Sequence, residues 1–125
     1  MKTVMVFGTY DFFHKGHADF FNQARKHGNF LIAVVAKDKN VKNIKGKLPK
    51  NKEKIRLSEV KKHSDKAVLG SLTDRYKVIK KLKPDIICLG YDQEADLKKL
   101  KEFNIPIKRL KPFKPHLYKS SKIKN

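Results

Sequence analysis

The residues best suited to chemistry lie together near the N-terminus, in the segment Gly8–His17, which reads GTYDFFHKGH. Glycine lets the backbone approach an anion closely, and free N–H groups at the start of a helix attract phosphate. His14 and His17 are three residues apart, so at a helix start they share one face. Their imidazole N–H groups can donate to phosphate oxygens. The segment therefore predicts a phosphate-binding loop.

Each of these residues also has a simpler interpretation. An H-x-x-H pair can form half of a metal site, Asp11 can cap the helix that follows, and Gly8 can serve only a tight turn. The combination favours phosphate binding, because a strand, two glycines, two histidines and a helix start fall within ten residues. The metal and capping alternatives stay open at this point.

Five apolar runs alternate with helix-like stretches along the chain. The runs are Thr3–Phe7, Phe30–Ala36, Ala67–Leu69, Asp85–Leu89 and Pro106–Ile107. Continuous apolar runs of this length are typical of strands buried on both faces, as in a parallel sheet. The helix-like stretches are Gly16–His27, Lys52–Lys62, a stretch that begins at Thr73, and Glu94–Phe103.

This alternation predicts an α/β fold, a single Rossmann-like domain over residues 1–125 with helices on both faces of the sheet. The usual order of five parallel strands in such a unit is 3-2-1-4-5, which makes Thr3–Phe7 the central strand. The order reverses beside this strand. Because ligands bind at that switch point, Gly8–His17 is placed where a ligand would lie.

Two segments are unusually basic. Lys37–Arg56 holds nine basic residues and two acids, and its middle part, Asn43–Pro49, is predicted to be a loop. The tail from Lys108 to Asn125 holds seven basic residues and no acid. Both segments follow strands, so we expect them to overhang the same end of the sheet and to become ordered when a triphosphate binds.

The chain as a whole carries 31 basic and 12 acidic residues, a net charge of +19. This charge attracts anions, but lysines spread along a chain are typical of a solvated surface. The single cysteine, Cys88, lies in an apolar run and is expected to be a small buried residue. Met1 and Lys2 lead directly into a strand, and no apolar run approaches a membrane span, so we expect a cytoplasmic protein.

The segment Gly8–His17 resembles the GTFDxxHxGH signature of the cytidylyltransferase-like nucleotidyltransferases, with Tyr10 in place of the usual phenylalanine. A second signature of this family, roughly ISSTxIR, is similar to Tyr118–Lys124, and the resemblance covers essentially the whole chain. The second match has departures: Lys119 replaces the first serine and Lys124 the usual arginine. Lysine keeps the charge but loses the bidentate fork of arginine.

The resemblance implies a reaction and a role for each matching residue. An oxygen of a substrate phosphate attacks the α-phosphorus of an NTP in line, and pyrophosphate leaves. His14 and His17 bind the triphosphate and stabilise the transition state. Lys45 reaches the phosphates, with Lys47 as a second candidate, and Arg56 lies near the substrate phosphate. The implied nucleotide-binding set is Gly8, Thr9, Tyr10, Asp11, His14, Gly16, His17, Gly90, Asp92, Ser120 and Ser121.

Structural alternatives exist for these residues too. Lys45 can be one solvated lysine among many, and Arg56 can pair with Glu59 on the same helix face. Ser120 and Ser121 can mark no more than a helix start. Asp92 can be a turn residue.

Within the family, the stretches Val35–Val41, Asp65–Ser71 and Leu89–Gln93 are most similar to archaeal-type FAD synthases. This similarity implies ATP and FMN as substrates, a divalent cation such as Mg²⁺, and a homodimer. Glycerol-3-phosphate cytidylyltransferases share the framework and use CTP, but show a GHDW-like stretch where this chain has GYDQ. A non-enzymatic RNA-binding module is a third alternative, favoured by the charge and disfavoured by the intact HxGH motif.

Overall fold

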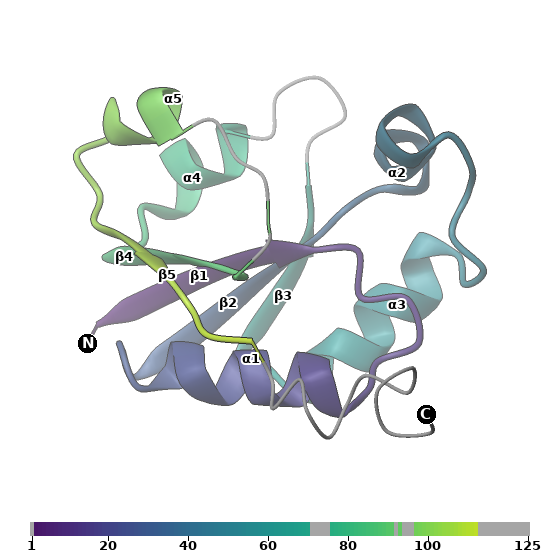
Figure 1. The fold of residues 1–125 in the computed structure, drawn as a ribbon, viewed down its shortest axis with the longest axis horizontal. Coiled ribbons are helices and arrows are strands. Elements are labelled where there is room, and N and C mark those ends of the chain that lie inside the picture. Colours follow the sequence, from purple (N-terminus) through teal and green to yellow (C-terminus); the bar gives the residue numbers. More distant parts are fainter. Residues whose placement is uncertain (1, 71–75, 92, 94–96, 113–125) are drawn as a thin grey trace, which may run out of the picture.

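One parallel sheet organises the chain. The computed structural model describes residues 2–70, 76–91, 93 and 97–112, with the side chains of Ile44, Lys45 and Leu97 excepted. The sheet has five strands in the order β3-β2-β1-β4-β5 (Figure 1). The strands are β1 (Thr3–Gly8), β2 (Phe30–Val35), β3 (Lys66–Leu69), β4 (Ile86–Leu89) and β5 (Ile107–Arg109).

The central position of β1 follows from its pairing on both edges. It pairs with β2 along its whole length, from Thr3 opposite Phe30 to Gly8 opposite Val35. On its other edge, Val4 lies opposite Ile86 in β4. The predicted α/β fold and strand order are confirmed.

Helices cover both faces of the sheet. They are α1 (Lys15–Arg25), α2 (Asp38–Lys45), α3 (Glu53–Lys61), α4 (Lys77–Leu82) and α5 (Leu97–Lys101). In Figure 1, α1 and α3 lie on one face, α4 and α5 lie on the other, and α2 stands beyond the end of β2. Side chains alternate along β1 accordingly: Val4 and Val6 pack with Phe21 of α1, whereas Met5 packs with Ile79 of α4. In the described part of the chain, no helix is both long and apolar enough to cross a membrane.

The prediction of a loop over Asn43–Pro49 is wrong in its first part. Residues 43–45 form the last turn of α2, which ends at Gly46 in the left-handed conformation with φ 83°. The helix is short and buries Val41, and most of its other residues are polar or charged. A carboxylate from another helix stabilises its start instead: the N–H of Asp38 donates to Oε1 of Glu53 at 2.8 Å.

The other predicted helices are present with shorter bounds. The stretch predicted from Thr73 appears as α4, and Glu94–Phe103 contains α5; Thr73 and Glu94 themselves lie outside the described residues. Cys88 is fully buried in β4, as expected, and burial raises the pKa of its thiol to about 11. That residues 1–125 form a single domain stays a prediction.

Candidate active site

The loop between β1 and α1 has an unusual backbone. Tyr10 and Phe12 both have positive φ, 55° and 53°, in the region that bulky residues rarely adopt. Tyr10 is buried at 4% exposure, and its ring lies over Gly8, where an added Cβ would come within 2.6 Å of a ring carbon. Gly8 is therefore required here by the packing of Tyr10. Phe12, by contrast, is 57% exposed.

The side chain of Tyr10 ends in a hydroxyl that is buried in the protein. The Tyr10 O–H is buried and has no hydrogen-bond partner among the described residues, and burial raises the pKa of this phenol well above its usual value. Because an unsatisfied buried hydroxyl is costly, we expect Tyr10→Phe to stabilise the fold by about 1 kcal/mol. Thermal unfolding should show a Tm higher by about 3–5 °C. A lower Tm would mean that the hydroxyl is bonded in the protein.

The side chains of His14 and His17 are fixed by hydrogen bonds and ring stacking at the start of α1. The backbone N–H of Gly16 donates to Nδ1 of His14 at 3.0 Å, and the N–H of His14 donates to Nδ1 of His17 at 3.3 Å. The two side chains thus form a reciprocal capping box, and their rings stack with centroids 3.8 Å apart. Since each Nδ1 accepts a hydrogen bond, each neutral ring carries its proton on Nε2.

Both imidazoles are held in the neutral form. Burial lowers the pKa of His14, and burial followed by the charge of His14 lowers the pKa of His17 to about 4. Protonation at Nδ1 would also break the capping bonds, because a protonated Nδ1 cannot accept. At pH 7 the pair therefore supplies Nε2–H donors and is a poor source of general bases.

The low pKa of His17 makes stability depend on pH. The unfolded chain, in which histidine has a pKa of about 6.5, binds more protons than the folded protein between about pH 6.5 and pH 4. The free energy of unfolding should therefore fall as the pH drops through this window. His17→Asn removes the titrating group, so its unfolding free energy should depend less on pH there. Denaturant titrations at several pH values test this, and identical slopes for the two proteins would contradict it.

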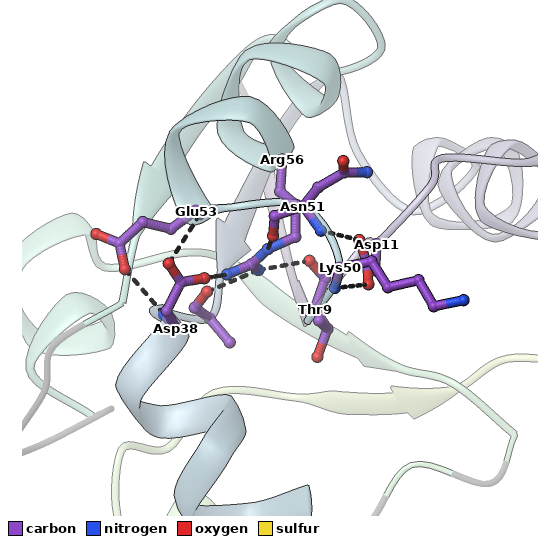
Figure 2. Close-up of polar contacts among 8 residues, drawn as sticks. Thr9, Asp11, Asp38, Lys50, Asn51, Glu53 and Arg56 are labelled. Carbon is purple, nitrogen blue, oxygen red and sulfur yellow. Dashed lines mark hydrogen bonds and ion pairs between the residues drawn. The ribbon is translucent and has the colours of Figure 1, made fainter. Parts of the chain in front are cut away.

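Asp11 joins this loop to the loop between α2 and α3. Its carboxylate accepts the N–H of Lys50 at 2.8 Å and the N–H of Asn51 at 3.0 Å (Figure 2). The alternative that Asp11 caps α1 is wrong, because His14 occupies the N-cap position. Asp11 instead fixes the β1–α1 loop against the segment that leads into α3.

Arg56 lies inside the protein. It is 1% exposed, and its guanidinium donates to the backbone oxygens of Asn51 at 3.0 Å and of Thr9 and Ala36 at 2.8 Å each. It also donates to Oδ1 of Asp38 at 2.6 Å (Figure 2). The guanidinium is thus surrounded by protein acceptors, and a contact of Arg56 with a substrate phosphate stays a prediction.

The alternative that Arg56 pairs with Glu59 is wrong. Glu59 lies near Lys62 and His63, each at 3.7 Å, while Asp38 pairs with Arg56. The two acids differ in position: Asp38 begins another helix, whereas Glu59 lies on the exposed side of α3. Helical spacing alone could not distinguish them.

The turn after β4 is fixed to the end of β1. The Gln93 side chain donates to the Phe7 oxygen at 3.0 Å and accepts the N–H of Gly90 at 3.0 Å. Arg109 of β5 donates to the oxygens of Gly90 and Gln93, both at 2.8 Å. Gly90 therefore lies beside the start of the Gly8–His17 loop, while Tyr91 is 53% exposed.

Comparison with known proteins decides the family. The family model described as cytidylyltransferase-like matches residues 5–125. The chain belongs to the cytidylyltransferase-like family. As a member of this family with several FAD synthase relatives, it is a nucleotidyltransferase.

Curated relatives and solved structures agree with this membership. FAD synthases of Ferroglobus placidus and Archaeoglobus profundus are 42% and 44% identical over 102 residues, 82% of this chain and 67% and 66% of theirs. That of Methanohalophilus mahii is 36% identical over 122 residues, 93% of this chain and 84% of its own. The chain thus spans about two thirds of the first two relatives.

Among solved structures, the lipopolysaccharide core biosynthesis protein of Thermoplasma volcanium matches with a TM-score of 0.79 and 36% identity. This match covers 90% of this chain and 97% of the other. Pantothenate synthetase of Thermus thermophilus matches at 0.54 and 12% identity, covering 89% of this chain and 55% of its own, and shares the fold.

The structure describes only some of the site residues that the family resemblance implies. Lys45 is the last residue of α2, with its side chain outside the described part, and Lys47 follows it as an exposed residue. Four predicted residues lie outside the described residues altogether: Asp92, Ser120, Ser121 and Lys124.

Sequence reasoning missed four residues that shape this site: Asp38, Glu53, Gln93 and Arg109. Two signals in the sequence pointed to three of them. Asp38 and Glu53 are the two acids in an otherwise basic segment, and Arg109 is one of few arginines in a lysine-rich chain.

The described residues do not build a metal cage of their own. They contain no group of three or more His, Cys, Asp or Glu side chains placed to hold an ion. Asp11, three residues before His14, uses both carboxylate oxygens on backbone N–H groups. The described residues could accommodate a divalent cation that enters with the triphosphate and is held by phosphate oxygens.

Proposed function

We propose that this protein transfers AMP from ATP to FMN, forming FAD and releasing pyrophosphate. The observation that carries the proposal is the 36–45% identity to archaeal FAD synthases over 96–122 residues. The neutral pair His14 and His17, at the switch point of the sheet, supports the same chemistry.

The reaction needs hydrogen-bond donors to phosphate oxygens more than it needs a general base. A phosphate monoester has a second pKa of about 6, so the attacking oxygen of FMN is already ionised at neutral pH. Catalysis then consists of alignment and of neutralising charge that spreads over the transition state. A His17 whose pKa is about 4 is a poor base but supplies an Nε2–H donor at neutral pH. His14, stacked on it, is proposed to donate in the same way.

The remaining roles are proposed from the family resemblance. Lys45 and Lys47 reach the phosphates from the end of α2, and Ser120 and Ser121 donate to the β- and γ-phosphates. The nucleoside lies beside Gly90 and Asp92, and the backbone of Gly8, Thr9, Tyr10, Asp11 and Gly16 lines the loop. Arg56 has no direct phosphate role in this assignment.

The cation, the assembly and the location are also proposals. Mg²⁺ would enter with ATP and neutralise phosphate charge. We propose a homodimer from the same resemblance, and a cytoplasmic location from the sequence.

A second candidate is a transferase that acts on another phosphorylated compound, such as a sugar or alcohol phosphate, with CTP. It is favoured by the solved relative from Thermoplasma volcanium, whose name refers to lipopolysaccharide core biosynthesis. This chain covers 97% of that protein but about two thirds of the first FAD synthases.

The deciding experiment crosses ATP and CTP with FMN and glycerol 3-phosphate and measures pyrophosphate release. The proposal expects the fastest release with ATP and FMN, together with FAD as product. Faster release with CTP and glycerol 3-phosphate would support the second candidate and keep the reaction class. No turnover with any pair, together with a salt-sensitive RNA complex, would favour the RNA-binding alternative.

A further inference from the structure

Arg56 is the only buried charged residue in the part of the chain that the structure describes. Burying a charge is expensive unless hydrogen bonds and a counter-charge replace water. Here three backbone oxygens and Asp38 do so. These partners belong to separate segments: Thr9 to the β1–α1 loop, Ala36 to the end of β2, and Asn51 to the entry of α3.

Around Arg56, two helices cap each other. The N–H of Asp38, at the start of α2, donates to Glu53, and the N–H of Glu53, at the start of α3, donates to Oδ2 of Asp38 at 3.3 Å. Figure 2 shows Asp38 between Arg56 and Glu53. Each carboxylate therefore accepts a free backbone N–H at the start of the other acid's helix.

The charges in this cluster balance. Each helix N-terminus carries about half a positive charge. Two such termini and one guanidinium are offset by the carboxylates of Asp38 and Glu53. Removing Arg56 would leave two acids facing each other and three carbonyl oxygens without their donor, so the segments would separate.

We propose that Arg56 is a positioning residue for nucleotidyl transfer. It fixes the loop that carries His14 and His17 relative to α2, which ends at Lys45. The histidines and Lys45 can then bind the same triphosphate. Asp11 makes a second connection between the same two loops through Lys50 and Asn51. The inference rests on the proposed function, but it assigns Arg56 a role through the protein and none on a phosphate.

A double-mutant cycle separates the two roles. Arg56→Lys keeps the charge but cannot bridge all four partners, and Asp38→Asn weakens the same cluster. Displacing a reacting group by about 1 Å costs about 10²-fold in rate, so each variant should lose about tenfold or more in kcat. The KM for FMN and the KM for ATP should each stay within about threefold of the parent values. The double variant should be no slower than the slower single variant, because both changes disrupt one unit.

The opposite pattern would overturn the proposal. If Arg56 binds the phosphate of FMN, Arg56→Lys raises the KM for FMN, Asp38→Asn leaves turnover unchanged, and the effects in the double variant multiply. Arg25→Lys is the matched control, since Arg25 pairs with Asp65 at 2.9 Å at the far end of α1. Its kcat should equal that of the parent protein.

Two further measurements keep the test decisive. If Arg56→Lys does not fold, Glu53→Gln, which keeps the shape and loses one charge, takes its place in the cycle. Amide hydrogen exchange at Asp38, Lys50 and Asn51 should be about tenfold faster in the cluster variants, whether or not a substrate turns over. If the parent protein releases no pyrophosphate with any substrate pair, the proposed function fails. Unchanged exchange at these amides would refute positioning on its own.

Discussion

Replacing His14 or His17 by asparagine is expected to lower kcat by about 10²-fold or more, with little change in Tm. The rate falls because asparagine places no donor where the Nε2–H of histidine lies, and losing one preorganised donor to developing charge costs about 10²–10³-fold. The fold survives because Oδ1 of asparagine takes the place of Nδ1, which accepts the capping N–H in the structure. Steady-state pyrophosphate release and thermal unfolding measure the two effects.

Alanine and glutamine variants separate capping from catalysis. His14→Ala loses the acceptor as well as the donor, so it should unfold more easily by about 1 kcal/mol in addition to the rate loss. His14→Gln carries an amide N–H near the position of Nε2 and should recover part of the rate. Near-normal turnover in both asparagine variants would remove the histidines from the mechanism. A transition metal held by both rings without nucleotide would favour the metal alternative.

The strand order and the position of the Gly8–His17 loop at the end of the central strand were predictable because the apolar runs are clear in the sequence. Runs such as Phe30–Ala36 are apolar over their full length, and the order of a half-Rossmann sheet then places Gly8–His17 at the switch point. The capping box of His14 and His17 was not predicted. Histidine is an uncommon cap, so the spacing indicated a shared face but not which nitrogen faces the backbone.

The role of Arg56 could not be obtained from sequence, because its partners are distant along the chain. The oxygens that it bonds belong to Thr9 and Ala36, 47 and 20 residues away. Carbonyl acceptors are present at every residue, so no pattern marks them. Helix α2 was missed for a related reason, since its first turn depends on Glu53, which is 15 residues further on.

Replacing Lys45, at the end of α2, by alanine is expected to lower kcat/KM for ATP by about ten- to a hundredfold. A charge-assisted hydrogen bond is worth about 1.5–3 kcal/mol, which corresponds to that range. Lys45 ends α2, the helix whose first residue, Asp38, bonds Arg56. Its backbone is thus tied to the loop that carries the histidines.

Lys80→Ala is the matched control for bulk charge. Lys80 is exposed on α4, the helix layer opposite α1 and α3, and its loss also lowers the net charge by one. Its effect should be small and should fade as salt is raised, because it acts only by steering ATP toward the protein. Lys45→Ala should keep most of its loss at high salt, since a donor in contact with phosphate is screened less than a distant charge. Equal losses at both positions, fading together with salt, would mean that the overall charge of +19 holds the nucleotide and that the end of α2 has no specific part in binding.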